Sequence, residues 1–220
     1  MRALVTGSSR GIGAAIVERL TFDGYGVDTP SRLELDLSNL QSVQNFLDNY
    51  QLVAPDLLVL NAGENFPLNL SDISTNHWLQ TMNVNLNSAF MLIRDIGTQM
   101  VKNKGGRIVV ISSCYSYRSR IGRAPYSASK AALNSLVQSA AIEFAENGVL
   151  VNGIAPGFVL TDLTYSNNDE EGLKQLASRI PLGRLASPNE IADVVAYIGS
   201  TENTYITGQV IAVDGGFLCQ

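Results

Sequence analysis

The chain has 220 residues, of which 45% are hydrophobic and 16% are charged, as is typical of one folded globular domain. Its formal net charge of -5 argues against a nucleic-acid-binding or anionic-membrane surface, because both need clustered Lys and Arg. No apolar run is long enough to span a bilayer, so we expect small-molecule partners and no membrane segment.

The N-terminal residues lead directly into an apolar run and lack the apolar region and cleavage site of a signal peptide. We therefore expect a cytoplasmic protein. Cys114 and Cys219 match no metal-ligand spacing, so two reduced thiols are favoured over a disulfide, and no metal site is predicted.

Short apolar runs alternate with longer segments of helical period along the chain. The runs are rich in Val, Ile and Leu, as in parallel strands buried on both faces, and span residues 3–5, 57–60, 108–111, 150–154 and 210–213. The helical segments span residues 11–22, 40–49, 77–102, 126–146 and 188–199, and the third is long enough for two helices. This alternation predicts a single α/β domain, a Rossmann-type doubly wound parallel sheet with helices on both faces.

A glycine-rich turn lies between the first predicted strand and the first predicted helix. Glycines allow a tight turn and close approach of a ligand to the backbone, while the helix N-terminus presents free N–H groups to a pyrophosphate. The turn has the spacing GxxxGxG and predicts a dinucleotide site. The residues expected to bind the cofactor here are Gly7, Ser9, Arg10, Gly11, Ile12 and Gly13.

The region of the second strand should hold the 2′ end of the cofactor's adenosine. Arg32 and Arg10 can form a cationic pair for a 2′-phosphate, which favours NADP(H) over NAD(H). The alternative is Asp28, as an acid that binds a ribose 2′-hydroxyl, although it lies only two residues after Gly26, early for the end of a strand.

Tyr126 and Lys130 are four residues apart in a predicted helix and therefore share one face of it. A cation beside a phenol stabilises the phenolate and lowers the pKa of the phenol toward neutrality, so the pair is a candidate acid/base catalyst. The same spacing also occurs on ordinary surface helices, so the pair needs support from the rest of the chain.

Several further motifs accompany this pair. In chain order they are the glycine turn, Asn61-Ala62-Gly63, Asn85, Ser113, Pro156-Gly157, and the C-terminal segments 206–210 and 213–216. Together they resemble the short-chain dehydrogenase/reductase family over nearly the whole chain. The resemblance implies a seven-stranded parallel sheet in one domain, and a homotetramer or homodimer packed through the helices that contain Val84 and Tyr126.

The resemblance also implies roles for four residues. Tyr126 would be the general acid toward a carbonyl, or the base toward an alcohol, and Ser113 would hydrogen-bond the same oxygen. Lys130 would hold the nicotinamide ribose and lower the Tyr126 pKa, and Asn85 would position Lys130 through a water. Prepositioned donors suit this chemistry, because hydride transfer to a carbonyl carbon builds negative charge on the oxygen.

The remaining cofactor contacts are implied in the same way, although the motifs at Asn61 and Pro156 would pass as ordinary turns in isolation. Asp36 and Leu37 would lie at the adenine, Asn61, Ala62 and Gly63 at the adenosine ribose, Pro156 and Gly157 at the nicotinamide, and Val159 and Thr161 at its carboxamide.

One region departs from the family pattern. Only a few residues separate the strand near Val27 from an expected strand at residues 33–36, where the family has a whole helix. Parallel neighbours normally need a longer crossover, so this corner holds either a very short strand or irregular structure.

The loop between Ser113 and Tyr126 must border the reacting centre if both assignments hold. It holds three arginines, and Tyr115, Arg118 and Arg120 are candidate substrate-binding residues, because arginine suits a carboxylate or phosphate. Loop arginines are more often solvated, which is the alternative. The polar segment 161–179 is predicted to include a lid over the substrate, with a surface helix of acidic first turn as the alternative.

The leading interpretation is an NADP(H)-dependent oxidoreductase that acts on a ketone or secondary alcohol, and an NAD(H)-linked enzyme of the same family is the alternative. A non-catalytic dinucleotide-sensing module is a further alternative, because one fold can serve many functions. A sensor needs the glycine turn but not the proton machinery, so the complete set of candidate catalytic residues favours an enzyme.

Overall fold

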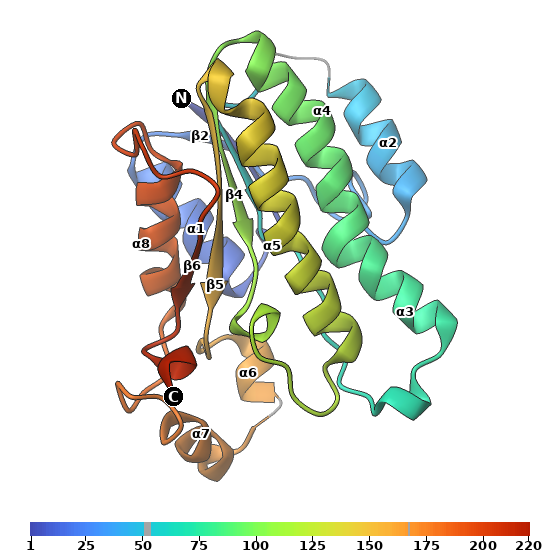
Figure 1. Cartoon of the computed structure of the whole chain (residues 1–220), viewed down its shortest axis with the longest axis vertical. Coiled ribbons are helices and arrows are strands. Elements are labelled where there is room, and N and C mark those ends of the chain that lie inside the picture. Colours follow the sequence, from blue (N-terminus) through green and yellow to red (C-terminus); the bar gives the residue numbers. More distant parts are fainter. Residues whose placement is uncertain (51–53, 167) are drawn as a thin grey trace.

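A single parallel sheet forms the centre of the molecule. The computed structural model describes residues 1–50, 54–166 and 168–220, and among these residues six strands pair in the order β2-β1-β3-β4-β5-β6. The strands are β1 (Arg2–Thr6), β2 (Gly26–Asp28), β3 (Leu57–Leu60), β4 (Gly106–Ile111), β5 (Val149–Pro156) and β6 (Val210–Val213). The doubly wound α/β prediction is confirmed, because helices cover both faces of this sheet (Figure 1).

The helices follow the predicted order. They are α1 (Gly11–Phe22), α2 (Leu40–Asn49), α3 (Thr75–Met82), α4 (Ser88–Lys102), α5 (Ala124–Phe144), α6 (Asp162–Ser166), α7 (Glu170–Ala177) and α8 (Pro188–Gly199). Helix α8 begins at a capping box in which Ser187 and Glu190 bond each other's backbone N–H groups. The predicted helical segment 77–102 is divided between α3 and α4, which a π-helical turn, Asn83–Asn87, joins.

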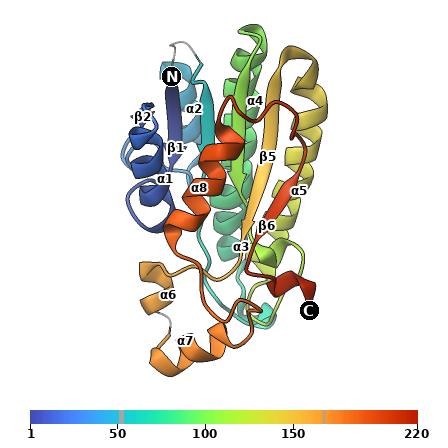
Figure 2. The same cartoon turned by 90° about the vertical axis from the view of Figure 1, so that its left-hand side faces the viewer.

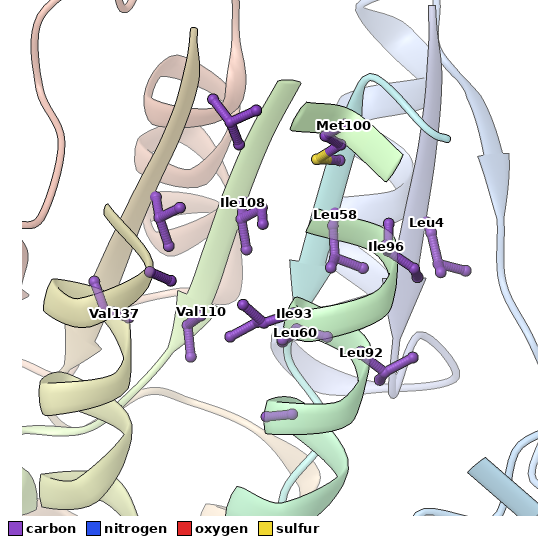
Figure 3. Packing of buried hydrophobic residues seen from close by; sticks show 14 of the residues in the cluster. Leu4, Leu58, Leu60, Leu92, Ile93, Ile96, Met100, Ile108, Val110 and Val137 are labelled. Carbon is purple, nitrogen blue, oxygen red and sulfur yellow. The ribbon is translucent and has the colours of Figure 1, made fainter. Parts of the chain in front are cut away.

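Successive strand residues enter two separate hydrophobic cores. Leu4, Leu58 and Ile108 pack with side chains of α2, α4 and α5 on one face of the sheet (Figure 3). Their neighbours Ala3 and Val109 pack with side chains of α1 and α8 on the other face, which Figure 2 shows from that side. Both faces of the inner strands β1, β3, β4 and β5 are therefore buried, which explains why these strands are apolar without alternation.

The corner after β2 corrects two expectations. The described residues form six strands where the resemblance implied seven, and no strand forms at residues 33–36. Instead, the backbone N–H groups of Glu34 and Leu35 donate to the Ser31 carbonyl at 3.1 and 2.9 Å, which makes a turn. Residues 29–39 alone connect β2 to α2, too few for a helical crossover and another parallel strand, so β2 is an edge strand.

The structure also describes the two cysteines and the lengths of the helices. Cys114 is buried, Cys219 is exposed, and both are free thiols, as predicted. Within residues 1–50, 54–166 and 168–220, no helix is both long and apolar enough to cross a membrane.

Candidate active site

The predicted catalytic side chains gather at the carboxyl end of the sheet. Ser113 follows the end of β4, and Asn85 lies in the π-helical turn that precedes α4. Tyr126 and Lys130 lie in the first two turns of α5, which begins at this end of the sheet (Figure 1). Ligands of open α/β sheets bind outside the carboxyl ends of the strands, so these residues occupy the expected place for a site.

Asn85 ties three segments of the chain together. It is 1% exposed, its Oδ1 accepts the Glu64 N–H at 2.8 Å, and its Nδ2 donates to the Glu64 carbonyl at 3.0 Å. Nδ2 also donates to Ser129 Oγ at 3.1 Å, and Ser129 Oγ donates in turn to the Tyr126 carbonyl at 2.8 Å. Asn85 thereby fixes the chain after β3 against the first turn of α5, from a π-helical turn of the kind common at functional sites.

Gly63 lies where Asn85 and Lys130 meet. A Cβ atom at Gly63 would lie 3.3 Å from Asn85 Oδ1 and 3.4 Å from Lys130 Nζ. The structure therefore brings these two predicted residues to one point, as the resemblance implied. Because Gly63 has no side chain, its backbone can lie close to both polar groups.

Lys130 is buried and points beneath the Tyr126 ring. It is 3% exposed, and its Nζ donates to the Ile111 carbonyl at 2.8 Å. Nζ lies 5.8 Å from the centroid of the Tyr126 ring. Burial lowers the pKa of Lys130 to about 8, because a charged ammonium is disfavoured away from water.

The Tyr126 pKa differs from the expectation. Burial raises the pKa of this phenol, while a hydrogen bond with Ser113 and, more weakly, the charge of Arg123 oppose the rise. Burial outweighs these contributions, because a phenolate shielded from water loses hydration. The lowering of this pKa by Lys130 stays a prediction, since Lys130 Nζ faces the ring and bonds the Ile111 carbonyl.

Ser113 is held by its own turn and by α5. Its Oγ accepts the Tyr115 N–H at 3.1 Å, and its carbonyl accepts from Ser116 Oγ at 2.6 Å. Ser116 Oγ accepts from Asn134 Nδ2 at 2.9 Å, which connects this turn to α5. Ser113 is thus prepositioned beside Tyr126 rather than free to rotate with a mobile loop.

The glycine turn has the form of an anion site. Gly7 and Gly11 adopt φ values of 65° and 55°, which favour glycine, and Asn61 Nδ2 donates to the Gly7 carbonyl at 2.9 Å. Helix α1 starts at Gly11 with no acidic residue in its first turn and no side-chain cap, so its first N–H groups can bind a phosphate. Thr161 also reaches this turn, because a Cβ at Gly11 would lie 3.2 Å from Thr161 Cγ2.

Alanine at Gly13 is expected to weaken folding and dinucleotide binding together. Its Cβ would overlap the Gly7 carbonyl oxygen and lie 2.5 Å from Asn61 Nδ2, so the glycine turn would have to move. We expect the free energy of unfolding to fall by about 1–3 kcal/mol, measured by urea unfolding, with weaker binding in a fluorescence titration. Gly26→Ala is the matched control, since a Cβ there meets nothing within 4 Å, and equal effects of both variants would contradict the prediction.

Four other predicted cofactor residues support the turn or flank it. Ile12 packs against the core beside α1 and α8, and Leu37 packs against the opposite core. The Ala62 N–H donates to Thr6 Oγ1 at 3.2 Å, which fixes the end of β3 beside β1. Ser9 is exposed in the turn.

Asp28 and Arg32, the two candidates to bind the 2′ group of the cofactor's adenosine ribose, lie in different environments near β2. Asp28 forms an ion pair with Arg2 at 2.7 Å and accepts the Tyr50 hydroxyl at 2.9 Å, so it is already engaged within the protein. The Arg32 side chain is 81% exposed and lies 3.6 Å from Asp36 Oδ1. The geometry favours Arg32 over Asp28 as the group that meets a ligand at this corner.

The segment after β5 is fixed by backbone contacts. The Gly157 N–H donates to the Val213 carbonyl at 3.0 Å, and a Cβ at Gly157 would lie 2.7 Å from Asp214 Cα. Val159 pairs in a β-bridge with Ala186, just before α8. The predicted nicotinamide residues, which begin with Pro156 at the end of β5, therefore lie on a rigid connection at the carboxyl end of the sheet.

The substrate-side candidates fall into different environments. The Tyr115 ring makes an edge-to-face contact with the Tyr126 ring, with 6.4 Å between centroids, so Tyr115 borders the site. Arg120 Nη1 donates to the Tyr115 hydroxyl at 3.3 Å. Arg118 Nη1 donates to the Gln220 carbonyl at 3.2 Å, and its guanidinium lies 6.0 Å from the Phe217 ring.

Sequence reasoning did not single out Ser129, which links Asn85 to α5. A signal was present, because Ser129 lies three residues from Tyr126, about one helical turn away. Arg123, one of the three loop arginines considered as anion-binding groups, lies 5.9 Å from the centroid of the Tyr115 ring.

The predicted lid segment contains two short helices. Helices α6 and α7 lie beyond the carboxyl ends of the strands in both views (Figures 1 and 2). Helix α7 has Glu170 and Glu171 in its first turn and Asp169 as its N-cap, whose side chain accepts the Gly172 N–H. Asn167, which belongs to the predicted lid, lies outside the described residues.

Comparison with known proteins agrees with this geometry. A family model described as enoyl-(acyl carrier protein) reductase matches residues 14–218. The 3-oxoacyl-[acyl-carrier-protein] reductase of Vibrio cholerae serotype O1 is 37% identical over 234 residues, covering 97% of this chain and 96% of that protein.

Solved structures are similar over the same extent. A putative NAD(P)-dependent gluconate 5-dehydrogenase from Beutenbergia cavernae, with bound NADP, has a TM-score of 0.93 and 33% identity, covering 100% of this chain and 97% of that one. A short-chain dehydrogenase/reductase family protein has a TM-score of 0.90 and 30% identity, covering 99% and 97%.

Proposed function

The chain belongs to the short-chain dehydrogenase/reductase family, and from this premise we propose that it reduces a ketone to a secondary alcohol with NADPH. The observation that carries the proposal is the convergence of Asn85, Ser113, Tyr126 and Lys130 beside a glycine turn whose helix N-terminus is free to bind phosphate. A dinucleotide site alone would suit a sensor. The proton-transfer groups beside it favour catalysis.

The residues present fit a dinucleotide. The α1 N-terminus with Gly7, Gly11 and Gly13 would hold its pyrophosphate, Gly63 would lie along the adenosine ribose, and Lys130 would hold the nicotinamide ribose. The nicotinamide supplies the hydride when the cofactor is bound.

The protein's own groups would handle the oxygen and the proton. Tyr126 would donate its hydroxyl proton to the carbonyl oxygen of the substrate, and the raised pKa of this buried phenol favours the protonated form that a reduction requires. Ser113 would hydrogen-bond the same oxygen, because its side chain lowers the pKa of the phenol and its backbone is fixed. Asn85 would act as a positioning residue, since its amide fixes the segment beside Gly63 and the backbone of Tyr126.

NADP(H) is the proposed cofactor. The gluconate 5-dehydrogenase neighbour has NADP bound, and the corner near β2 offers the exposed Arg32. NAD(H) remains the alternative within the same proposal, because Arg32 has Asp36 close by.

Removal of the cationic pair is expected to reduce the preference for NADPH over NADH. We expect Arg10→Gln and Arg32→Gln each to lower the ratio of kcat/KM with NADPH to kcat/KM with NADH by about three- to tenfold, because each variant loses one exposed charge-assisted hydrogen bond. Arg94→Gln is the control, because Arg94 pairs with Asp95 on α4. Steady-state kinetics with both cofactors measure the ratio, and a wild-type preference for NADH would overturn the assignment.

The substrate class is tested with a carbonyl panel. The relatives named above act on a 3-oxoacyl thioester and on a sugar acid, so the panel contains 3-oxoacyl thioesters, keto acids and keto sugars. Turnover of any member with NADPH supports the proposal. Binding of NADPH without turnover of any carbonyl or alcohol would favour the sensing module.

The proposal extends to assembly and to the lid. We place a homodimer or homotetramer contact on α4 and α5, because Phe90 and Ile142 on these helices are 47% and 79% exposed and apolar.

The segment 161–179 would close over the substrate. Its first residue, Thr161, lies beside the glycine turn, and helices α6 and α7 follow it beyond the carboxyl ends of the strands. We also propose that the protein is cytoplasmic.

A further inference from the structure

The three arginines of the loop between Ser113 and Tyr126 are not equivalent. Arg118 bonds the Gln220 carbonyl and Arg120 bonds the Tyr115 hydroxyl. The Nε atom of Arg123 is buried and has no hydrogen-bond partner within the described residues. Its guanidinium lies 5.9 Å from the centroid of the Tyr115 ring, and it forms no side-chain hydrogen bond or ion pair with the described residues.

An unpaired arginine in this position is energetically unfavourable. Burial lowers the pKa of Arg123, which shows that the guanidinium has lost hydration without gaining a carboxylate. Acidic partners are available in this chain, and Arg19, Arg94 and Arg184 each pair with one. A desolvated cation that lacks a protein partner is suited to receive an anion from a ligand.

Arg123 is also close to the reacting centre. It immediately precedes α5 and lies three residues before Tyr126. The Tyr115 ring contacts both the Tyr126 ring, at 6.4 Å, and the Arg123 guanidinium, so the two groups flank one aromatic side chain. The first turn of α5 contains no acidic residue that could neutralise the arginine.

We propose that Arg123 binds an anionic oxygen of the substrate, from a carboxylate or a phosphate, beside the carbonyl that Tyr126 protonates. The inference rests on the proposed reduction and narrows its substrate to carbonyl compounds that carry a negative charge near the ketone. A 3-oxoacyl thioester has no such charge next to its ketone, so this chain would differ in specificity from its 3-oxoacyl-[acyl-carrier-protein] reductase relatives.

The test uses pairs of ligands in which one member carries an anionic group and the other a neutral one near the same ketone, bound to the full chain saturated with NADPH. Acetoacetate is compared with methyl acetoacetate, and dihydroxyacetone phosphate with dihydroxyacetone, so the two arms distinguish carboxylate from phosphate. Both turnover and ligand dissociation constants are measured. Binding is recorded at 4 °C with Tyr126→Phe as background, so that it is independent of reduction.

We expect the charged member of at least one pair to bind at least about tenfold more tightly than its neutral partner, as one charge-assisted contact predicts. Arg123→Gln should remove that difference, Arg123→Lys should restore part of it, and Arg94→Gln, at an arginine paired with Asp95 on α4, should leave it unchanged. Wild-type protein without a preference for either anion, or Arg123→Gln with the preference intact, would overturn the inference.

Failure of the inference is distinguishable from failure of the proposed function. Turnover of neutral ketones without any charge preference would retain the reductase and remove the role of Arg123. Charge-dependent binding that needs Arg123, without turnover of any carbonyl, would retain the anion site and remove the reductase. Arg123→Gln must also show wild-type NADPH affinity and a melting temperature no lower than that of wild type. Loss of either would show that Arg123 supports the fold through Tyr115, which contradicts the ligand role.

Discussion

Replacement of Tyr126 by phenylalanine is expected to reduce kcat/KM for ketone reduction by about 10²- to 10⁴-fold, the usual contribution of a positioned general acid. The variant removes one hydroxyl and keeps the ring that packs against Tyr115 and lies over Lys130 Nζ. The fold and the affinity for NADPH should therefore change little. Steady-state kinetics on the best panel substrate and a fluorescence titration of NADPH measure the two quantities.

A matched control separates the effect of the position of Tyr126 from the effect of removing a tyrosine hydroxyl. Tyr205→Phe removes the same hydroxyl from a side chain that is 96% exposed, and it should leave both quantities unchanged. Retention of more than a tenth of the activity in Tyr126→Phe would exclude this phenol as the proton donor. Loss of activity together with NADPH binding would assign Tyr126 a structural role instead.

Lys130→Met is expected to abolish turnover and, at the same time, to stabilise the protein without cofactor. Activity should fall by at least about 10²-fold, because a buried charge and its bonds to the cofactor ribose contribute about 3 kcal/mol. Stability should rise because burial lowers the pKa of Lys130 to about 8 from a usual 10.5. The folded state therefore disfavours the ammonium form that predominates at pH 7.

The pH dependence of this stabilisation follows from the lowered pKa. Below pH 8 both the folded and the unfolded chain bind the Lys130 proton, and the folded chain bears the full desolvation penalty. Between pH 8 and 10.5 only the unfolded chain binds it, so the penalty diminishes as pH rises. The advantage of Lys130→Met over wild type should be largest near pH 7 and shrink above pH 8.

Thermal melting at several pH values measures this effect. A gain of about 1 kcal/mol corresponds to an increase in Tm of about 2–4 °C for a chain of this size. Lys102→Met, at the exposed end of α4, is the control and should give no pH-dependent difference. A variant at Lys130 that melts below wild type at pH 7 would contradict the penalty, since the bond to the Ile111 carbonyl would then outweigh it.

Much of the fold was predictable because local signals agreed with one another. The apolar runs at residues 57–60 and 210–213 are strands with those bounds, and α8 starts at the capping box Ser187-Pro188-Asn189-Glu190. Ser113, Tyr126 and Lys130 meet because their chain positions fall after the end of β4 and in the first turns of α5. Such positions follow from periodicity and from the rule that parallel strands share a carboxyl edge.

Other features depend on contacts that no local pattern encodes. The π-helical turn at Asn83–Asn87 arises where Asn85 bonds Glu64 and Ser129, which are distant in sequence. The raised Tyr126 pKa depends on burial and on where Lys130 Nζ points, and the helical spacing of four residues gives only their common face. The separate environments of Arg118 and Arg123 likewise depend on the C-terminal residues and on Tyr115.

The missing strand after β2 has a consequence for association between molecules. An edge strand presents unpaired backbone groups that can recruit another chain and start aggregation. Here the edge strand at this corner is β2, which has only 3 residues, and its last residue, Asp28, is paired with Arg2 and Tyr50. So short and charged an edge strand is a poor template for β-pairing between molecules. The shortened corner therefore makes the sheet narrower without creating an edge that promotes aggregation.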